Sequence, residues 1–212
     1  MGEGKVEGWL DWKCMLRGQK EFQVVVPGVL LGPQAVLDNG HVVKQMGVEH
    51  NVGAVVRAIE TGRLDEACLA PDRLQRLGVP NAPWEQLHLD VEDSAEQDLL
   101  PAVRAAADWI HAARAKHSVY VHCQMGVSRS ATIVIGYLML KENMTLVDAV
   151  SLVKSRRPIV NPNPGFIEQL RKLEVEILHE QAAARRLERQ TQVGGEPSGH
   201  PGTSRLSFSS LV

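Results

Sequence analysis

The sequence predicts an α/β fold in which a β-sheet is covered by helices. Short apolar segments of the strand type alternate with segments of helical periodicity, which is the pattern of α/β domains. Helix patterns dominate the C-terminal half. The 212 residues, of which 44% are hydrophobic and 23% charged, suffice for one well-buried domain with some chain left over.

Five short segments are predicted to be strands because of their apolar, strand-type pattern. Pro27 separates the first two, and the fifth leads into a loop that contains Cys123. The predicted strands span residues 23–26, 28–31, 48–56, 86–91 and 117–121.

Six segments are predicted to be helices from their apolar periodicity and their end signals. The spacings of Ser94 to Gln97 and of Thr145 to Asp148 are those of a capping box, so each pair should open a helix. Residues 57–70 have no clean period and are predicted to be a loop or a broken helix. The predicted helices span residues 38–47, 71–78, 94–116, 130–142, 145–156 and 166–190.

The two ends of the chain differ in composition from the middle. Residues 1–20 are polar, with Trp9 and Trp12 three positions apart, and we expect an N-terminal arm there. Residues 21–182 form the predicted domain. Residues 183–212 continue the last helix and then become rich in Gly, Pro and Ser, which predicts a disordered C-terminal tail.

The overall charge and the cysteine content limit the function classes. A net charge of −2 argues against a chain built as a whole for nucleic acid or an anionic membrane surface. No apolar run reaches the roughly 18 residues of a membrane span, and the N-terminus carries no visible secretory signal. Three cysteines without regular spacing favour a reducing compartment. We therefore expect the protein in the cytoplasm, with the nucleus as a second location.

The stretch from Val119 to Ser130 carries the chemistry of the chain. Its sequence, Val-Tyr-Val-His-Cys-Gln-Met-Gly-Val-Ser-Arg-Ser, joins a strand to a helix through a tight loop. Such a loop directs several backbone N–H groups at one point, where the helix dipole favours negative charge. Arg129 can hold two phosphate oxygens with its planar fork. Cys123 would lie in the same positive field, which favours a nucleophilic thiolate, and Gly126 lets the loop turn closely around the anion.

The arrangement His-Cys-x5-Arg-Ser resembles the signature of the cysteine-dependent protein phosphatases. The continuation Ser-Ala-Thr-Ile-Val-Ile-Gly-Tyr-Leu-Met is most similar to their dual-specificity branch. The resemblance covers about residues 23–180 and implies a central, mostly parallel sheet of about five strands flanked by helices, with the Cys-x5-Arg loop between a strand and a helix. It also implies hydrolysis of phosphotyrosine and of phosphoserine or phosphothreonine in proteins through a phosphocysteine. In a small, atypical member of this kind the phosphate-binding loop comprises His122, Gln124, Met125, Gly126, Val127, Ser128 and Arg129.

A positioned acid should protonate the leaving oxygen, because an alkoxide is a poor leaving group. The string Val91-Glu92-Asp93 resembles the general-acid loop of the family, which implies that Asp93 is the acid, with Asp90 as the second candidate. In the second step the same group would take a proton from the attacking water. A helix cap is the structural alternative for Asp93.

Three further positions have supporting roles that the resemblance implies. In the family, the hydroxyl that matches Ser130 hydrogen-bonds the cysteine sulfur and helps it to leave, although a serine at a helix start is common in any case. His122 should tune the cysteine through a buried hydrogen-bond network. Residues 156–166 resemble the motif in which the residue matching Asn163 holds the phosphate loop, and a turn asparagine between prolines is the alternative.

No metal or other cofactor is expected, because Arg129 and the loop amides supply the charge stabilisation and the eight histidines are scattered. The expected partners are phosphorylated proteins, with MAP kinases among the candidates although no docking domain for them is evident. Cys14 or Cys68 could pair with Cys123, but no spacing requires it.

Other functions stay open at this point. A catalytically weak relative would hold phosphoproteins without cleaving them, although it would need neither a thiolate nor an acid. Another phosphatase would act on inositol lipids or RNA 5′-phosphates, and lipid-directed relatives tend to carry lysines in the loop, where Gln124, Met125, Val127 and Ser128 are uncharged. A sulfurtransferase or a small tyrosine phosphatase is a further alternative, but the latter carries its motif near the N-terminus.

Overall fold

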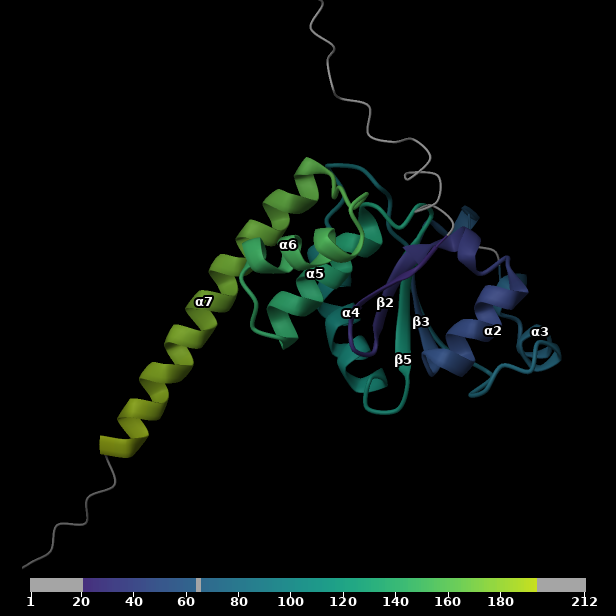
Figure 1. The fold of residues 1–212 in the computed structure, drawn as a ribbon. Coiled ribbons are helices and arrows are strands. Elements are labelled where there is room, and N and C mark those ends of the chain that lie inside the picture. The colour runs from purple at the N-terminus through teal and green to yellow at the C-terminus, as the bar shows by residue number, and fades with distance from the viewer. Residues whose placement is uncertain (1–20, 64–65, 194–212) are drawn as a thin grey trace, which may run out of the picture. The chain divides into compact units, whose positions relative to one another are not determined.

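A five-stranded sheet forms the centre of the protein (Figure 1). The computed structural model describes residues 21–63 and 66–193. The strand order is β1-β2-β5-β3-β4, in which β1 is antiparallel to β2 and every other neighbouring pair is parallel. This confirms the predicted α/β fold with a mostly parallel sheet. The strands are β1 (Gln23–Val26), β2 (Val29–Pro33), β3 (Val52–Ala58), β4 (Glu85–Leu89) and β5 (Ser118–Cys123).

The helices lie between the strands and after the last of them. The chain divides within the final helix, between Glu176 and Ile177, and the sheet and all site residues discussed below belong to the first unit. The helical elements are η1 (Gln34–Val36), α2 (Gly40–Glu49), η2 (Thr61–Arg63), η3 (Ala67–Leu69), α3 (Pro71–Arg76), α4 (Leu100–Ala113), α5 (Arg129–Lys141), α6 (Leu146–Arg156) and α7 (Pro164–Val193).

Helices cover both faces of the sheet. Figure 1 shows α2 and α3 on one side and α5 and α6 on the other. On the α2 side the core contains Leu30, Val55, Trp84 and Tyr120, each at most 3% exposed. On the opposite side, residues 129–139 of α5 are buried without interruption, which explains why apolar side chains occur all round this helix. Because both faces are packed, the carboxyl ends of the central strands are held firmly in place.

The predicted strand 48–56 begins too early. Val48 and Glu49 belong to the last turn of α2, and β3 starts only at Val52. Between them Asn51 adopts a positive φ of 53°, a left-handed conformation that asparagine tolerates. This residue turns the chain out of the helix, so the predicted strand 48–56 is divided between the end of α2 and β3.

The predicted helix 94–116 also begins too early, because α4 starts at Leu100. The Ser94 Oγ does accept a hydrogen bond from the Gln97 N–H, at 3.2 Å, but this contact closes a turn ahead of the helix. The second predicted capping box is confirmed, since Thr145 Oγ1 accepts from the Asp148 N–H at 3.2 Å and α6 follows.

The arm predicted for residues 1–20 and the tail from residue 194 lie outside the described residues, and the domain limits 21 and 182 stay a prediction. Within the described ranges, no helix is both long and apolar enough to cross a membrane. The same ranges contain no group of three His, Cys, Asp or Glu side chains that could hold a metal ion. Cys123 is a free thiol, Cys68 is buried, and Cys14 is not among the residues described.

Candidate active site

The predicted phosphate loop joins the central strand β5 to the buried helix α5. Cys123 ends the strand and Arg129 begins the helix. The strands β2 and β3 flank β5 in parallel. The loop therefore lies at the carboxyl ends of three neighbouring strands, which is where open α/β sheets bind their ligands.

Cys123 lies at the bottom of this loop and is 1% exposed. Its Sγ accepts hydrogen bonds from the backbone N–H of Gly126 and from the hydroxyl of Ser130, each at 3.2 Å. Donors converge on the sulfur in this way when it is to carry negative charge. The Ser130 hydroxyl thus has the position that the family resemblance implies.

Gly126 allows the loop to turn against strand β2. Its φ is +65°, and a Cβ added there would lie 2.4 Å from the carbonyl carbon of Gly32. Only glycine combines this backbone conformation with so close an approach. The neighbouring Gln124 is exposed, and its Oε1 accepts a hydrogen bond from Arg63 Nη1 at 3.3 Å.

The guanidinium of Arg129 is buried beside carboxylates. Its Nη1 donates to the carboxylate of Glu60 and to the carbonyl of Val91, the latter at 3.1 Å. Partial burial raises the pKa of Glu60, but hydrogen bonds from its own backbone and from Arg129 outweigh this and place the pKa below its usual value. The Arg129 Nε–H has no hydrogen-bond partner among the described residues, and a phosphate oxygen is a natural acceptor for it.

Asp93 lies beside the same loop. Its Oδ1 accepts hydrogen bonds from Ser128 Oγ at 2.7 Å and from Asn163 Nδ2 at 2.9 Å, and its Oδ2 lies 3.7 Å from Arg129 Nε. The structure does not bear out the helix-cap alternative, because α4 begins at Leu100. The second candidate, Asp90, instead accepts the Thr61 N–H at 2.8 Å and does not line the cavity that contains Cys123.

The protein-family model for the catalytic domain of dual specificity phosphatases matches residues 44–176 of this chain. The chain belongs to this family. It is 36% identical over 148 residues to bovine (Bos taurus) dual specificity protein phosphatase 26, covering 69% of this chain and 64% of that protein. It is 38% identical over 157 residues to mouse (Mus musculus) dual specificity protein phosphatase 13B, covering 71% of each. The chain therefore spans less than two thirds of the length of the first of these relatives.

Two further comparisons found a curated relative and a solved structure. A Dictyostelium discoideum protein described as MAP kinase phosphatase with leucine-rich repeats protein 3 is 30% identical over 153 residues, which cover 72% of this chain and 16% of that protein. The crystal structure of the human tyrosine phosphatase-like serine/threonine/tyrosine-interacting protein is similar with a TM-score of 0.64 and 26% identity, and the match covers 75% of this chain and 99% of the other. The latter similarity supports the five-stranded phosphatase fold.

Asn163 connects the two halves of the candidate site. Its backbone N–H donates to Ser128 Oγ at 3.1 Å, while its side chain donates to Asp93 and accepts the Phe166 N–H at 2.9 Å. The neighbouring Asn161 N–H donates to the Val127 carbonyl at 3.0 Å. The segment before α7 thus contacts both the phosphate loop and the loop that carries Asp93.

The buried hydrogen-bond network expected around His122 is not found among the described residues. The ring Nδ1 lies 3.4 Å from the Cys123 carbonyl oxygen, and Nε2 has no hydrogen-bond partner. The ring instead stacks on Tyr120, with centroids 5.6 Å apart. Burial chiefly lowers the pKa of His122 to about 3, with a contribution from Arg57, so the imidazole is neutral at physiological pH. The ring is fully buried and stacked on Tyr120, and it lies beside Arg57 of the neighbouring strand β3.

A cavity of about 480 Å³ opens over Cys123. Its rim includes Met125, which is 43% exposed. Arg129 is the one cationic side chain among the described lining residues, so the pocket suits a single phosphate. The lining residues are Asp93, Cys123, Met125, Val127, Ser128, Arg129, Asn161, Asn163 and Pro164.

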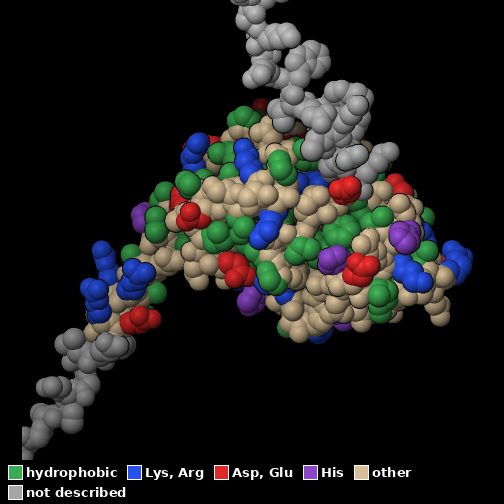
Figure 2. Space-filling model, viewed as in Figure 1, with side chains coloured by type: hydrophobic (Ala, Val, Ile, Leu, Met, Phe, Trp, Pro, Cys, Tyr) green, Lys and Arg blue, Asp and Glu red, His purple; other side chains and the backbone are tan. Residues whose placement is uncertain are grey.

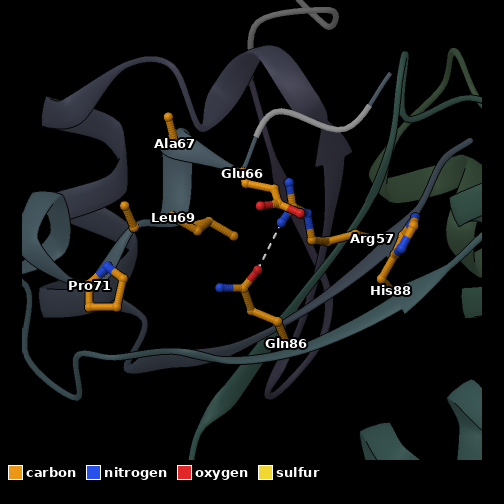
Figure 3. A pocket seen from close by; sticks show the side chains of 8 residues that line it. Arg57, Glu66, Ala67, Leu69, Pro71, Gln86 and His88 are labelled. Atoms are coloured by element: carbon orange, nitrogen blue, oxygen red, sulfur yellow. Dashed lines mark hydrogen bonds between the residues drawn. The ribbon is translucent and has the colours of Figure 1, made fainter. Parts of the chain in front are cut away.

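A second hollow, of about 520 Å³, shares no residue with this cavity. Arg57 and His88 from adjacent strands line it together with Gln86 and Glu66, and Arg57 Nη1 donates to Gln86 Oε1 at 2.9 Å (Figure 3). On the molecular face in Figure 2, acidic and basic side chains are intermixed without an extended basic patch.

Reasoning from the sequence missed two residues of the site, Glu60 and Arg157. Glu60 follows β3 by two positions and so lies at the same edge of the sheet as Cys123, a position that could have identified it. Arg157 stands in the segment before Asn163, but its fully buried side chain contacts the phosphate loop, which no local pattern indicates.

Proposed function

We propose that this chain hydrolyses phosphotyrosine and phosphoserine or phosphothreonine in proteins through a phosphocysteine intermediate. One observation carries the proposal: Cys123, Arg129 and Asp93 line one cavity, at the carboxyl end of the central strand. A nucleophile, an oxyanion-binding group and a proton donor are the parts that such a reaction needs.

In the first step the Cys123 sulfur attacks phosphorus, the S–P bond forms and the P–O ester bond breaks. Asp93 gives its proton to the departing oxygen, which leaves as a neutral hydroxyl. Charge on the three remaining phosphoryl oxygens is stabilised by Arg129 and the loop amides, with the N-terminus of α5 adding its dipole.

In the second step a water molecule attacks the phosphocysteine. The Asp93 carboxylate takes a proton from this water, the S–P bond breaks and inorganic phosphate leaves. The Ser130 hydroxyl, 3.2 Å from the sulfur, stabilises the thiolate as it departs. The enzyme thereby returns to its starting state with thiolate and protonated acid.

The proposed partners are phosphorylated proteins. We include MAP kinases among them because the Dictyostelium relative is described as a MAP kinase phosphatase. The uncharged loop positions and the single arginine in the cavity favour a protein monophosphate over an inositol polyphosphate. Cytoplasm, with the nucleus as a second location, stays our proposal for where the protein acts.

The test is release of phosphate from a peptide that carries both phosphothreonine and phosphotyrosine. Inositol phosphates and RNA with a 5′-phosphate serve as competing substrates, each with and without a metal chelator. We expect release from both peptide residues, independent of the chelator. The Cys123→Ser variant should lose turnover and still bind phosphate, because the loop amides and Arg129 are unchanged.

Faster release from inositol phosphates or RNA would assign a non-protein substrate. Binding of the phosphopeptide without any release by the unmodified chain would instead indicate a phosphoprotein-binding relative. Either result would contradict the proposed activity.

A further inference from the structure

Arg157 is the largest side chain that is fully buried, with 1% of its surface exposed. It follows directly after α6. Its guanidinium donates hydrogen bonds to four oxygens: Nε to the Gly126 carbonyl at 2.8 Å, Nη2 to the Met125 carbonyl at 3.2 Å, and Nη1 to the Glu21 carbonyl at 3.0 Å and to Gln23 Oε1 at 2.5 Å. One side chain therefore joins the phosphate loop to the first strand.

We propose that Arg157 is a positioning residue that turns the amides of the phosphate loop toward Cys123 and supplies positive charge from beneath the loop. The proposal rests on the proposed function only in taking Cys123 as the anion of the site.

The geometry of the peptide unit supports the positioning role of Arg157. In a planar trans peptide the C=O and the following N–H point in opposite directions. When Arg157 holds the Met125 carbonyl on the outer side of the loop, the Gly126 N–H must point inward, and it does donate to Cys123 Sγ at 3.2 Å. The contact with the Gly126 carbonyl fixes the direction of the Val127 N–H in the same manner.

The charges around the Arg157 guanidinium support its electrostatic role. All four acceptors of Arg157 are neutral oxygens, whereas Arg129 donates to the Glu60 carboxylate. Burial chiefly lowers the pKa of Arg157, and electrostatic interactions with Tyr120, Cys123 and Glu21 oppose this effect. Arginine nevertheless stays protonated in proteins. A buried cation without a bonded carboxylate favours an anion nearby, and the Cys123 loop binds that anion.

The test compares Arg157→Met and Arg157→Lys with Arg156→Met, a matched control at the exposed neighbouring position. Two quantities are measured on the full chain: the pH profile of Cys123 alkylation by iodoacetamide, followed by mass spectrometry of the Cys123 peptide, and the affinity for inorganic phosphate. Circular dichroism establishes that each variant is folded.

We expect Arg157→Met to move the alkylation profile upward by about one pH unit, as loss of a nearby opposite charge should. Its phosphate affinity should fall about tenfold. Arg157→Lys keeps the positive charge and loses the planar guanidinium that holds both loop carbonyls. Its alkylation profile should therefore stay near that of the unmodified chain, while its phosphate affinity falls. Arg156→Met should change neither quantity.

A folded Arg157→Met variant with an unchanged profile and unchanged phosphate affinity overturns the proposal. If that variant does not fold, Arg157→Lys decides, because unchanged phosphate affinity there overturns the positioning role. These readouts need no substrate turnover. An unmodified chain without phosphatase activity would therefore contradict the proposed function while the effects of Arg157 would still stand.

Discussion

The Asp93→Asn substitution removes a proton donor and leaves the size of the side chain unchanged. The amide oxygen can still accept the hydrogen bonds that Asp93 Oδ1 receives from Ser128 Oγ at 2.7 Å and from Asn163 Nδ2 at 2.9 Å. The contact of Oδ2 with Arg129 Nε at 3.7 Å is lost. Partly exposed ion pairs contribute about 0–1 kcal/mol, so the free energy of unfolding should fall by no more than about 1 kcal/mol.

The loss in rate should be much larger than this loss in stability. A positioned general acid contributes roughly 10²–10⁴-fold, equivalent to about 3–5 kcal/mol of activation free energy. The size depends on the leaving group: a tyrosine phenol has a pKa of about 10, whereas an aliphatic hydroxyl leaves less readily. The loss should therefore be largest for phosphoserine and phosphothreonine, smaller for phosphotyrosine and smallest for nitrophenyl phosphate.

The assay is kcat for these three kinds of substrate, with thermal unfolding of each variant as a check of stability. Asp90→Asn is the matched control, because Asp90 accepts the Thr61 N–H in an exposed loop and does not line the cavity that contains Cys123. Equal losses on all three substrates in Asp93→Asn would refute the reasoning. So would a selective loss on poor leaving groups in Asp90→Asn.

Three further predictions concern the loop and its surroundings. Gly126→Ala should abolish turnover and lower the free energy of unfolding by about 3 kcal/mol, because the added Cβ would lie 2.4 Å from backbone atoms. Gly62→Ala is the control: no atom lies within 4 Å of its added Cβ, so turnover and the free energy of unfolding in urea should both stay unchanged. The pKa of His122 is about 3 in the folded chain, while the unfolded chain takes up this proton near the ordinary value of 6.5. Its stabilising contribution is thus complete above pH 6.5 and falls as the pH drops toward 3, by about 2 kcal/mol at pH 5, and urea unfolding of His122→Asn should show a flatter pH dependence. Asn163→Ala removes a hydrogen bond to Asp93 that is worth about 1 kcal/mol, so kcat on phosphotyrosine should fall about tenfold. The rate of Cys123 alkylation should not change, and a parallel change in alkylation would contradict a role of Asn163 through Asp93 alone.

The sheet and its connections could be predicted from the sequence because they rest on local patterns. The apolar run before Cys123 gave a buried strand, and the uniformly apolar segment after Ser130 gave a helix packed in the core, as β5 and α5 are. Element starts were harder to place. Asn51 turns the chain out of α2 by adopting a positive φ, and apolar periodicity does not report a backbone conformation of this kind.

The residues of the candidate site likewise fall into two groups, those close together in the sequence and those far apart in it. Cys123, Arg129 and Ser130 lie within eight positions, so the loop itself fixes their relation. Glu60 and Arg157 reach the loop from 63 and 34 positions away from Cys123, and only the parallel arrangement of β3 and the end of α6 brings them there. The position of Glu60 just after a strand could have indicated its role, whereas no spacing rule in one sequence connects Arg157 with the loop.

The charges around the loop couple the protonation of Asp93 to the binding of the substrate phosphate. Two guanidinium groups, Arg129 and Arg157, lie around the loop together with the carboxyl groups of Glu60 and Asp93, both beside Arg129, and with the Cys123 sulfur. A proton on Asp93 removes one negative charge from the site, which favours a phosphate dianion, and a bound dianion in turn repels an ionised Asp93. Binding of the anion and protonation of the acid therefore support each other. The group that must donate a proton in the first step is thus favoured in its protonated form when substrate is bound.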